Sequence, residues 1–153
     1  MDTLIRFVLL TVDGQAYALP LEVVDHTLRA VEITILPGAP NVVEGIINIH
    51  GEIIPVVSIR KRLGLVNRSL EISDSLVVAH TRTRRLTIIA ESVLGIIERS
   101  ADAVVGTGEI FFHGAHPIEG VLKTNDGLVL IQDVGRFFSP KEELSLDLAL
   151  ERR

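Results

Sequence analysis

The 153-residue chain contains no cysteine and no tryptophan, and only six of its residues are aromatic. The absence of cysteine excludes disulfides, zinc sites with thiolate ligands and thiol nucleophiles. No apolar run approaches the roughly 20 residues of a membrane-spanning helix, and the first residues lack the pattern of a secretory signal. A formal charge of -5 argues against nucleic acid as a partner, because phosphate neutralisation needs a basic face. We therefore expect a soluble, cytoplasmic protein that neither binds nucleic acid nor inserts into a membrane.

Aliphatic residues are abundant instead. Valine and isoleucine together supply 35 residues and leucine another 20. Because β-branched side chains suit a pleated sheet, this composition favours β-structure with aliphatic packing over a helix bundle. The length suits one domain or two very small intertwined halves, and it suffices to bury roughly 70% of the unfolded surface.

Short apolar runs separated by turn residues predict a β-barrel or sandwich. The Asp13-Gly14 dipeptide marks the turn of a first hairpin, and His50-Gly51 that of a second. The expected elements, in chain order, are strands at 4–12, 15–19 and 33–36, a helical turn at 41–45, strands at 45–49 and 52–59, and a helical turn at 60–63.

The second half of the chain repeats the pattern of the first. An offset of 69 residues places Phe7 on Leu76 and Glu22 on Glu91 without a gap. An offset of 75 residues places the hairpin that begins at Gly45 onto residues 120–138. Each half is therefore expected to form a small curled sheet of about five strands, within one domain that covers residues 1–153.

The C-terminal segment is predicted to be a helix. Ser139 is a suitable N-cap, Pro140 fits the first helical position, and Glu142 stands three residues after the cap. The leucines at alternate positions from 144 to 150 would also fit a strand, but the capping box favours a helix.

Residues with metal-binding chemistry are scattered. His113 and His116 have a spacing found in metal sites, and His26 and His50 would add to this chemistry if the fold brought them together. A site normally needs three or four ligands, so we expect no metal. Two basic clusters, at 60–62 and 82–85, are either solvated turns or a surface for an acidic partner.

Catalytic constellations are absent from the pattern. Ser58 lacks the G-x-S-x-G elbow of a serine hydrolase, and the residues 106–108 lack the lysine and helix start of a phosphate loop. We expect no enzyme and no cofactor. Two barrels this small leave aliphatic surface exposed, which indicates a module that binds other proteins. A barrel that binds a small ligand or metal through its histidines is the alternative.

A specific resemblance supports the protein-binding hypothesis. Residues 45–57 have the sequence G-I-I-N-I-H-G-E-I-I-P-V-V, which resembles the G-V-I-N-L-R-G-x-I-I-P-V-V motif of the CheW-like chemotaxis adaptor family. Residues 17–24 are similar to the family's Y-x-I-x-I-x-x-V strand, 36–40 to its I-P-x-x-P turn, and 127–138 to its closing strand. The resemblance extends over essentially the whole chain.

Membership of this family would imply an all-β fold of two intertwined five-stranded SH3-like barrels, with short helical turns and a C-terminal helix. It would also imply a non-enzymatic scaffold that links the cytoplasmic tips of methyl-accepting chemoreceptors to the regulatory domain of a CheA-type histidine kinase. The resemblance places the kinase-binding surface at Val31, Glu32, Ile33, Ile35 and Gly45. It places the receptor-binding surface at Val24, His26, His50, Val93 and Ile96.

Three residues depart from the family pattern. His26 replaces a glutamate, His50 replaces an arginine, and Ser58 replaces an aspartate. We hypothesise that His26 and His50 lie side by side in place of an ion pair, because losing both charges together avoids an unpaired one. Their protonation at about pH 6 would then weaken partner binding. These departures leave open an adaptor for a divergent or non-chemotactic pathway.

Overall fold

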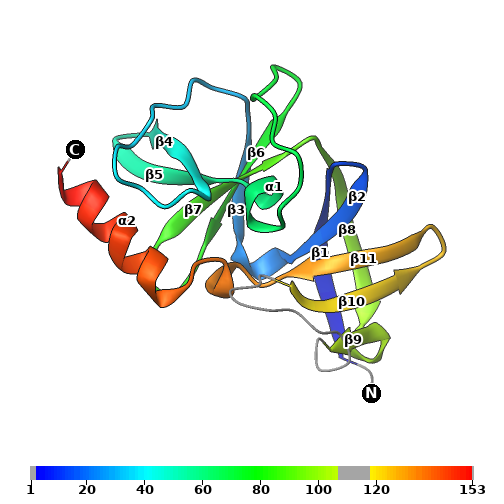
Figure 1. The fold of residues 1–153 in the computed structure, drawn as a ribbon. Coiled ribbons are helices and arrows are strands. Elements are labelled where there is room, and N and C mark those ends of the chain that lie inside the picture. The colour runs from blue at the N-terminus through cyan, green and yellow to red at the C-terminus, as the bar shows by residue number, and fades with distance from the viewer. Residues whose placement is uncertain (1–2, 107–117, 153) are drawn as a thin grey trace.

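The computed structural model describes residues 3–106 and 118–152, which form two curled β-sheets and a C-terminal helix (Figure 1). The strands are β1 (Leu4–Val12), β2 (Gln15–Pro20), β3 (Val24–Arg29), β4 (Val43–Ile49), β5 (Glu52–Val57), β6 (Ser75–His80), β7 (Arg85–Ala90), β8 (Ser92–Ser100), β9 (Val104–Gly106), β10 (Ile118–Thr124) and β11 (Gly127–Gln132). The helices are α1 (Ile59–Arg62) and α2 (Pro140–Arg152), with single 3₁₀ turns at Leu21–Val23, Ala101–Ala103 and Val134–Arg136. In the described part of the chain, no helix is both long and apolar enough to cross a membrane.

The two sheets are intertwined. The first barrel has the strand order β8-β1-β2-β11-β10-β9, and the second barrel has the order β3-β6-β7-β5-β4. Each barrel therefore takes one edge strand from the chain just after the other barrel's central hairpin, since β3 comes after β2 and β8 comes after β7. The expectation of intertwined halves is confirmed, but the first barrel has six strands because the three-residue β9 pairs with β10.

The hydrogen-bond registers of the two barrels match at the offsets found in the sequence. The parallel pair of Val56 with Thr87 in the second barrel is equivalent to that of Ile131 with Ala18 in the first. A bulge between Val43 and Gly45 of β4 recurs 75 residues later, between Ile118 and Gly120 of β10.

Each barrel has its own small core, built from equivalent positions. The matched core residues are Phe7 with Leu76, Leu122 with Ile47, Val129 with Ile54, and Ile131 with Val56. A third and larger core lies between the barrels and includes Leu10 and Tyr17 of the first, Val77 of the second, and Leu146 of α2. This shared core explains the aliphatic surplus, because three apolar interiors are filled by one short chain.

Local chemistry sets the ends of several elements. Asp13 and Gly14 both have positive φ (55° and 77°), as the two-residue turn between β1 and β2 requires. The Ser58 hydroxyl accepts the Lys61 N–H at 3.2 Å and caps α1, so β5 ends at Val57 and not at 59 as expected.

The predicted capping box of α2 is confirmed. The Ser139 hydroxyl accepts the Glu142 N–H at 3.2 Å, and the Glu142 carboxylate accepts the Ser139 N–H at 2.8 Å. The capping box supplies partners for two backbone N–H groups at the start of this helix, and the alternating leucines lie in the helix Pro140–Arg152 and not in a strand.

Two local predictions are wrong. Residues 33–36 do not form a strand, because only Thr34 pairs, in an isolated bridge with Ile46. Residues 41–45 do not form a helical turn, because a tight turn from Pro40 to Val43 leads directly into β4.

Candidate partner-binding surfaces

The segment 31–35, predicted to face a kinase, lies on the outside of the second barrel. Val31 and Glu32 are exposed, and Ile35 exposes 78% of its surface. Ile33 points the other way and packs against the core of the second barrel. The segment therefore anchors one apolar side chain and presents two others to solvent.

Backbone contacts hold this segment in place. The Thr34 N–H donates to the Ile46 carbonyl at 3.0 Å, and the Ile46 N–H donates to the Thr34 carbonyl at 2.8 Å. Gly45 makes this approach possible, because a Cβ at that position would lie 2.3 Å from the Thr34 oxygen and 2.6 Å from a methyl carbon of Ile33. Gly45 is itself buried, so it positions the segment and does not present surface to a partner.

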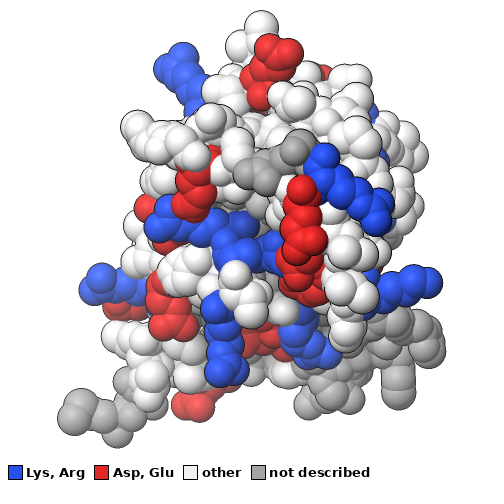
Figure 2. All heavy atoms as spheres, turned by 90° about the vertical axis from the view of Figure 1, so that its left-hand side faces the viewer, with Lys and Arg blue, Asp and Glu red and all other residues white. Residues whose placement is uncertain are grey.

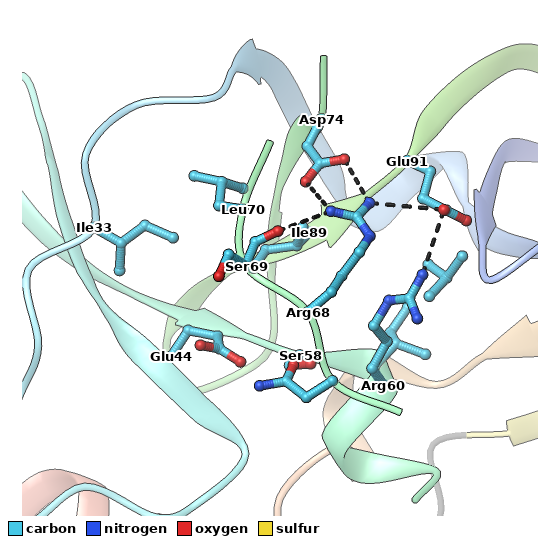
Figure 3. A pocket seen from close by; sticks show the side chains of 13 residues that line it. Ile33, Glu44, Ser58, Arg60, Arg68, Ser69, Leu70, Asp74, Ile89 and Glu91 are labelled. Carbon is cyan, nitrogen blue, oxygen red and sulfur yellow. Dashed lines mark hydrogen bonds and ion pairs between the residues drawn. The ribbon is translucent and has the colours of Figure 1, made fainter. Parts of the chain in front are cut away.

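A cavity of about 40 Å³ lies beneath this segment and adjoins a network of ion pairs (Figure 3). The Arg68 guanidinium donates two hydrogen bonds to the Asp74 carboxylate, at 2.9 and 2.8 Å, and lies 3.7 Å from Glu91. Arg60 donates to Glu91 at 3.3 Å and to Asp13 at 3.0 Å. The network connects the loop between α1 and β6 with the β1–β2 turn, so it braces one barrel against the other.

Asp74 is the buried centre of this network. Burial acts to raise the pKa of its carboxyl, but hydrogen bonds from the Arg68 guanidinium and the Glu71 backbone N–H outweigh burial and hold the pKa below its ordinary value. The hydrogen bonds to Asp74 in turn raise the pKa of Arg68. Both groups are therefore charged at neutral pH and serve to fix the loop.

The residues predicted to face a receptor lie mainly on the two exchanged edge strands. Val24 of β3 and Val93 of β8 occupy equivalent positions, and both pack half-buried against the shared core. Ile96 of β8 exposes 60% of its surface, and its neighbour Leu94 exposes 59%. Edge strand β8 thus presents an apolar surface that Leu94 extends, and Leu94 was not among the predicted residues.

The hypothesis that His26 and His50 form a pair is not supported. His26 lies on β3 and His50 in the β4–β5 turn, and these elements form opposite edges of the five-stranded sheet. Within the described residues, no hydrogen bond or ion pair joins the two imidazoles. The spacing of His26 and His50 in the sequence could not show whether their side chains meet. The distance between the two edges of the sheet that carry them depends on how the sheet curls.

A different histidine is paired instead. His80 Nδ1 lies 2.8 Å from an Asp25 carboxylate oxygen. Arg85 lies 3.3 Å from the other Asp25 oxygen and donates to Glu52 at 3.2 Å. These four groups form a band of polar contacts across one end of the second barrel, on strands that are distant in the sequence.

Most residues of the two basic clusters form ion pairs within the protein, so the clusters are neither solvated turns nor a free surface for an acidic partner. Arg62 donates two hydrogen bonds to Glu142 of α2, at 2.6 and 2.9 Å. Arg84 forms ion pairs with Glu143 and Asp147 of the same helix. Figure 2 accordingly shows basic and acidic side chains interspersed on the face of the molecule that carries α2. These arginines attach the C-terminal helix to the second barrel.

Metal chemistry finds no support in the described residues, where no group of three or more histidine, aspartate or glutamate side chains is arranged to hold an ion. His113 and His116 lie outside the described residues, as do Thr107 and Gly108 of the glycine-rich stretch.

The fold is a pair of interleaved barrels, and exposed apolar side chains lie on separate segments of it. This arrangement defines the class: a double-barrel protein with surfaces suited to binding other proteins. The chain belongs to the CheW-like domain family, whose model matches residues 6–142. The Chemotaxis protein CheW of Treponema pallidum is 27% identical over 146 residues, which cover 92% of this chain and 86% of that protein. The Chemotaxis protein CheW of Thermotoga maritima is 28% identical over 137 residues, covering 88% of this chain and 89% of that one.

A solved structure has the same fold. The scaffolding protein TtCheW from Thermoanaerobacter tengcongensis superposes with a TM-score of 0.82 at 24% sequence identity, covering 93% of this chain and 96% of that one. The resemblance inferred from residues 45–57 is therefore confirmed at the level of family and fold.

Proposed function

We propose that the protein is a non-enzymatic adaptor of a chemotaxis signalling pathway, which binds the regulatory domain of a CheA-type histidine kinase and the cytoplasmic tip of a chemoreceptor. It would act in the cytoplasm, at the receptor array. The match of the CheW-like model to residues 6–142 carries this proposal. The names of the two bacterial relatives point to the same pathway.

The arrangement of exposed apolar residues supports two separate contacts. Val31 and Ile35 belong to a segment braced by the second barrel, and Ile96 belongs to edge strand β8 of the first barrel. An adaptor must hold two partners at once, and two apolar surfaces on different segments of the chain allow this without competition. The kinase is assigned to the segment 31–35 and the receptor to the surface around Val24, Val93 and Ile96.

Three isoleucine or leucine substitutions to serine test the assignment. Burying one exposed isoleucine at an interface contributes about 1.5–3 kcal/mol, so its loss should weaken binding by about tenfold or more. We expect Ile35→Ser to weaken kinase-domain binding alone and Ile96→Ser to weaken binding of a receptor-tip fragment alone, both measured by titration calorimetry.

Leu128→Ser is the matched control, because Leu128 exposes 57% of its surface on a hairpin outside both sets. Both affinities should be unchanged in this variant. A wild-type protein that bound neither partner would contradict the adaptor function, and exchanged effects of the two isoleucine variants would contradict the assignment of surfaces.

A further inference from the structure

The outer side of α2 carries two exposed leucines. Leu146 and Ala149 are buried in the shared core and mark the inner side of the helix. Leu144 and Leu148 lie one turn apart on the other side, where they expose 61% and 42% of their surface. α2 lies at the edge of the molecule, so this side faces away from both barrels (Figure 1). It is a separate surface, because none of the residues assigned to the kinase or the receptor belongs to α2.

Most acidic side chains of α2 are already paired within the chain. Glu142 forms an ion pair with Arg62. Arg84 forms ion pairs with both Glu143 and Asp147. These contacts fix the rotation of the helix about its axis, so the two exposed leucines are presented to solvent in one orientation.

Two further charged residues flank the leucines. Lys141 stands three positions before Leu144 and Glu151 three positions after Leu148, and both are exposed. No ion pair joins the side chain of either to another described residue. Each has the unfavourable sign for its own helix, because Lys141 lies in the first turn, at the positive end of the dipole, and Glu151 in the last turn, at the negative end. A partner that brings the opposite charges would compensate both.

This outer pattern is complementary to itself when it is read in the opposite direction. An antiparallel second copy of α2 places Leu144 against Leu148 of that copy, and Lys141 against its Glu151. The same contacts recur by two-fold symmetry, as in any isologous interface. Lys141 then lies beside the negative end of the other helix and Glu151 beside the positive end. The spacing of these four residues, at i, i+3, i+7 and i+10, is that of the seam in a two-stranded coiled coil.

We propose that the protein self-associates through α2, with the helices of two copies packed antiparallel. The occupant is a second copy because it carries both the leucine spacing and the opposite charges that this surface requires. The contact runs along one 13-residue helix, about 20 Å long, and is therefore smaller than a standard protein–protein interface. We expect a weak dimer with a Kd on the order of 0.1–1 mM, which forms where the protein is concentrated.

Sedimentation equilibrium of the full chain tests the proposal without kinase or receptor, so its outcome is independent of the adaptor function. We expect the weight-average mass to rise from that of one chain toward that of two as the concentration increases from about 0.01 to 2 mM. A mass that stays at one chain throughout this range would overturn the proposal.

Substitution of one leucine identifies the surface. Leu144→Ser should weaken self-association by about tenfold or more, because each leucine is buried twice in a symmetric dimer. Leu128→Ser is the matched control, since Leu128 exposes 57% of its surface on β11, and its self-association should equal that of the wild type. Similar self-association of the two variants would show that α2 is not the interface.

Exchanging the two charges tests the antiparallel arrangement. Lys141→Glu and Glu151→Lys each place like charges opposite one another and should weaken self-association by about tenfold at low ionic strength. Each also gives the helix a charge that its dipole favours, so both variants should keep the helix content of the wild type in circular dichroism.

The double variant Lys141→Glu/Glu151→Lys restores two pairs of opposite charges and should self-associate as the wild type does. An equimolar mixture of the two single variants restores the same pairs in a heterodimer and should regain association that neither variant shows alone. Unchanged association in the single variants, or no recovery in the double variant and the mixture, would contradict the antiparallel pairing.

Discussion

The two barrels share one plan of strands and registers but fill it with different side chains. Phe7 in the core of the first corresponds to Leu76 in the second, and Ala18 corresponds to Thr87, although each pair occupies the same ladder position. The backbone plan therefore depends on the spacing of apolar positions and bulges, and it tolerates changes of volume and polarity at single sites.

The barrels differ most in the segment that follows the strand of each parallel pair, which is β5 in the second barrel and β11 in the first. Val57 of β5 leads into α1 and a loop that Arg68 and Asp74 lock by a buried ion pair. Gln132 of β11 leads into a 3₁₀ turn and then α2. The two equivalent exits therefore have different roles: the first leads to a loop whose ion pairs join the two barrels, and the second leads to the terminal helix.

The equivalent glycines should give the largest effects. A Cβ at Gly45 would lie 2.3 Å from the Thr34 oxygen, and one at Gly120 would lie 2.7 Å from the Val105 oxygen. We expect Gly45→Ala and Gly120→Ala each to lower the free energy of unfolding by about 3 kcal/mol, measured by urea denaturation. Only Gly45→Ala should also weaken kinase-domain binding in the folded population. Equal loss of binding in both variants would show that the barrels are not specialised.

The ion pair at Asp74 should give the next largest effect. Asp74→Asn leaves Arg68 without its main partner and should cost about 2–3 kcal/mol at pH 7. The exposed Arg6–Glu98 pair of the first barrel is the control, and Glu98→Gln should change stability by less than about 0.5 kcal/mol.

The same pair predicts an acid dependence. Because the folded pKa of Asp74 lies below the unfolded value of about 3.9, its stabilisation is complete above about pH 4 and is lost as the pH falls through the folded pKa. Unfolding free energies measured from pH 7 to pH 2 should fall less steeply in Asp74→Asn. An identical slope in both proteins would contradict this role.

The attachment of α2 should give a smaller effect. Hydrogen bonding from Arg62 holds the pKa of Glu142 below its ordinary value, and the same carboxylate closes the capping box. Glu142→Gln should cost about 1–2 kcal/mol and speed hydrogen exchange along α2. Glu151→Gln, in the last turn of α2, is the control that should leave exchange unchanged.

Removing the unpartnered polar groups should give the smallest effect, with the opposite sign. Gln132→Val and Thr87→Val should each raise the free energy of unfolding by about 1 kcal/mol. Each substitution removes a buried polar group that is shielded from water and makes no hydrogen bond with the described residues. Thermal unfolding followed by calorimetry would measure this, and a destabilised Gln132→Val would mean that its amide is satisfied in solution.

Features set by neighbouring residues could be predicted from the sequence. The Asp13-Gly14 turn, the Ser139 capping box and the repeat offsets depend on residues a few positions apart or on apolar spacing, and all three appear in the structure. Family and fold could be inferred from the motif at 45–57.

Features that depend on contacts between distant segments could not be predicted. Arg84 and Glu143 are 59 positions apart, and Asp25 and His80 are 55 apart, so no local pattern indicates either pair. The single bridge at Thr34 depends on how closely residue 45 allows the backbone to approach. The predicted partner surfaces at Ile35 and Ile96 rest on resemblance, and their exposure alone does not name what binds them.

The positions of β3 and β8, each of which follows a hairpin of one barrel and forms an edge strand of the other, have a consequence for folding. The β1–β8 ladder joins Leu4 to Ser100, so the first barrel cannot close until most of the chain has been synthesised. Such high contact order predicts folding on the millisecond-to-second scale in one cooperative transition. Cutting the chain between β5 and β6 would divide both barrels, because each barrel contains strands from both sides of that cut. Partners bound to the segment 31–35 and to β8 would therefore be connected through both barrels of one chain.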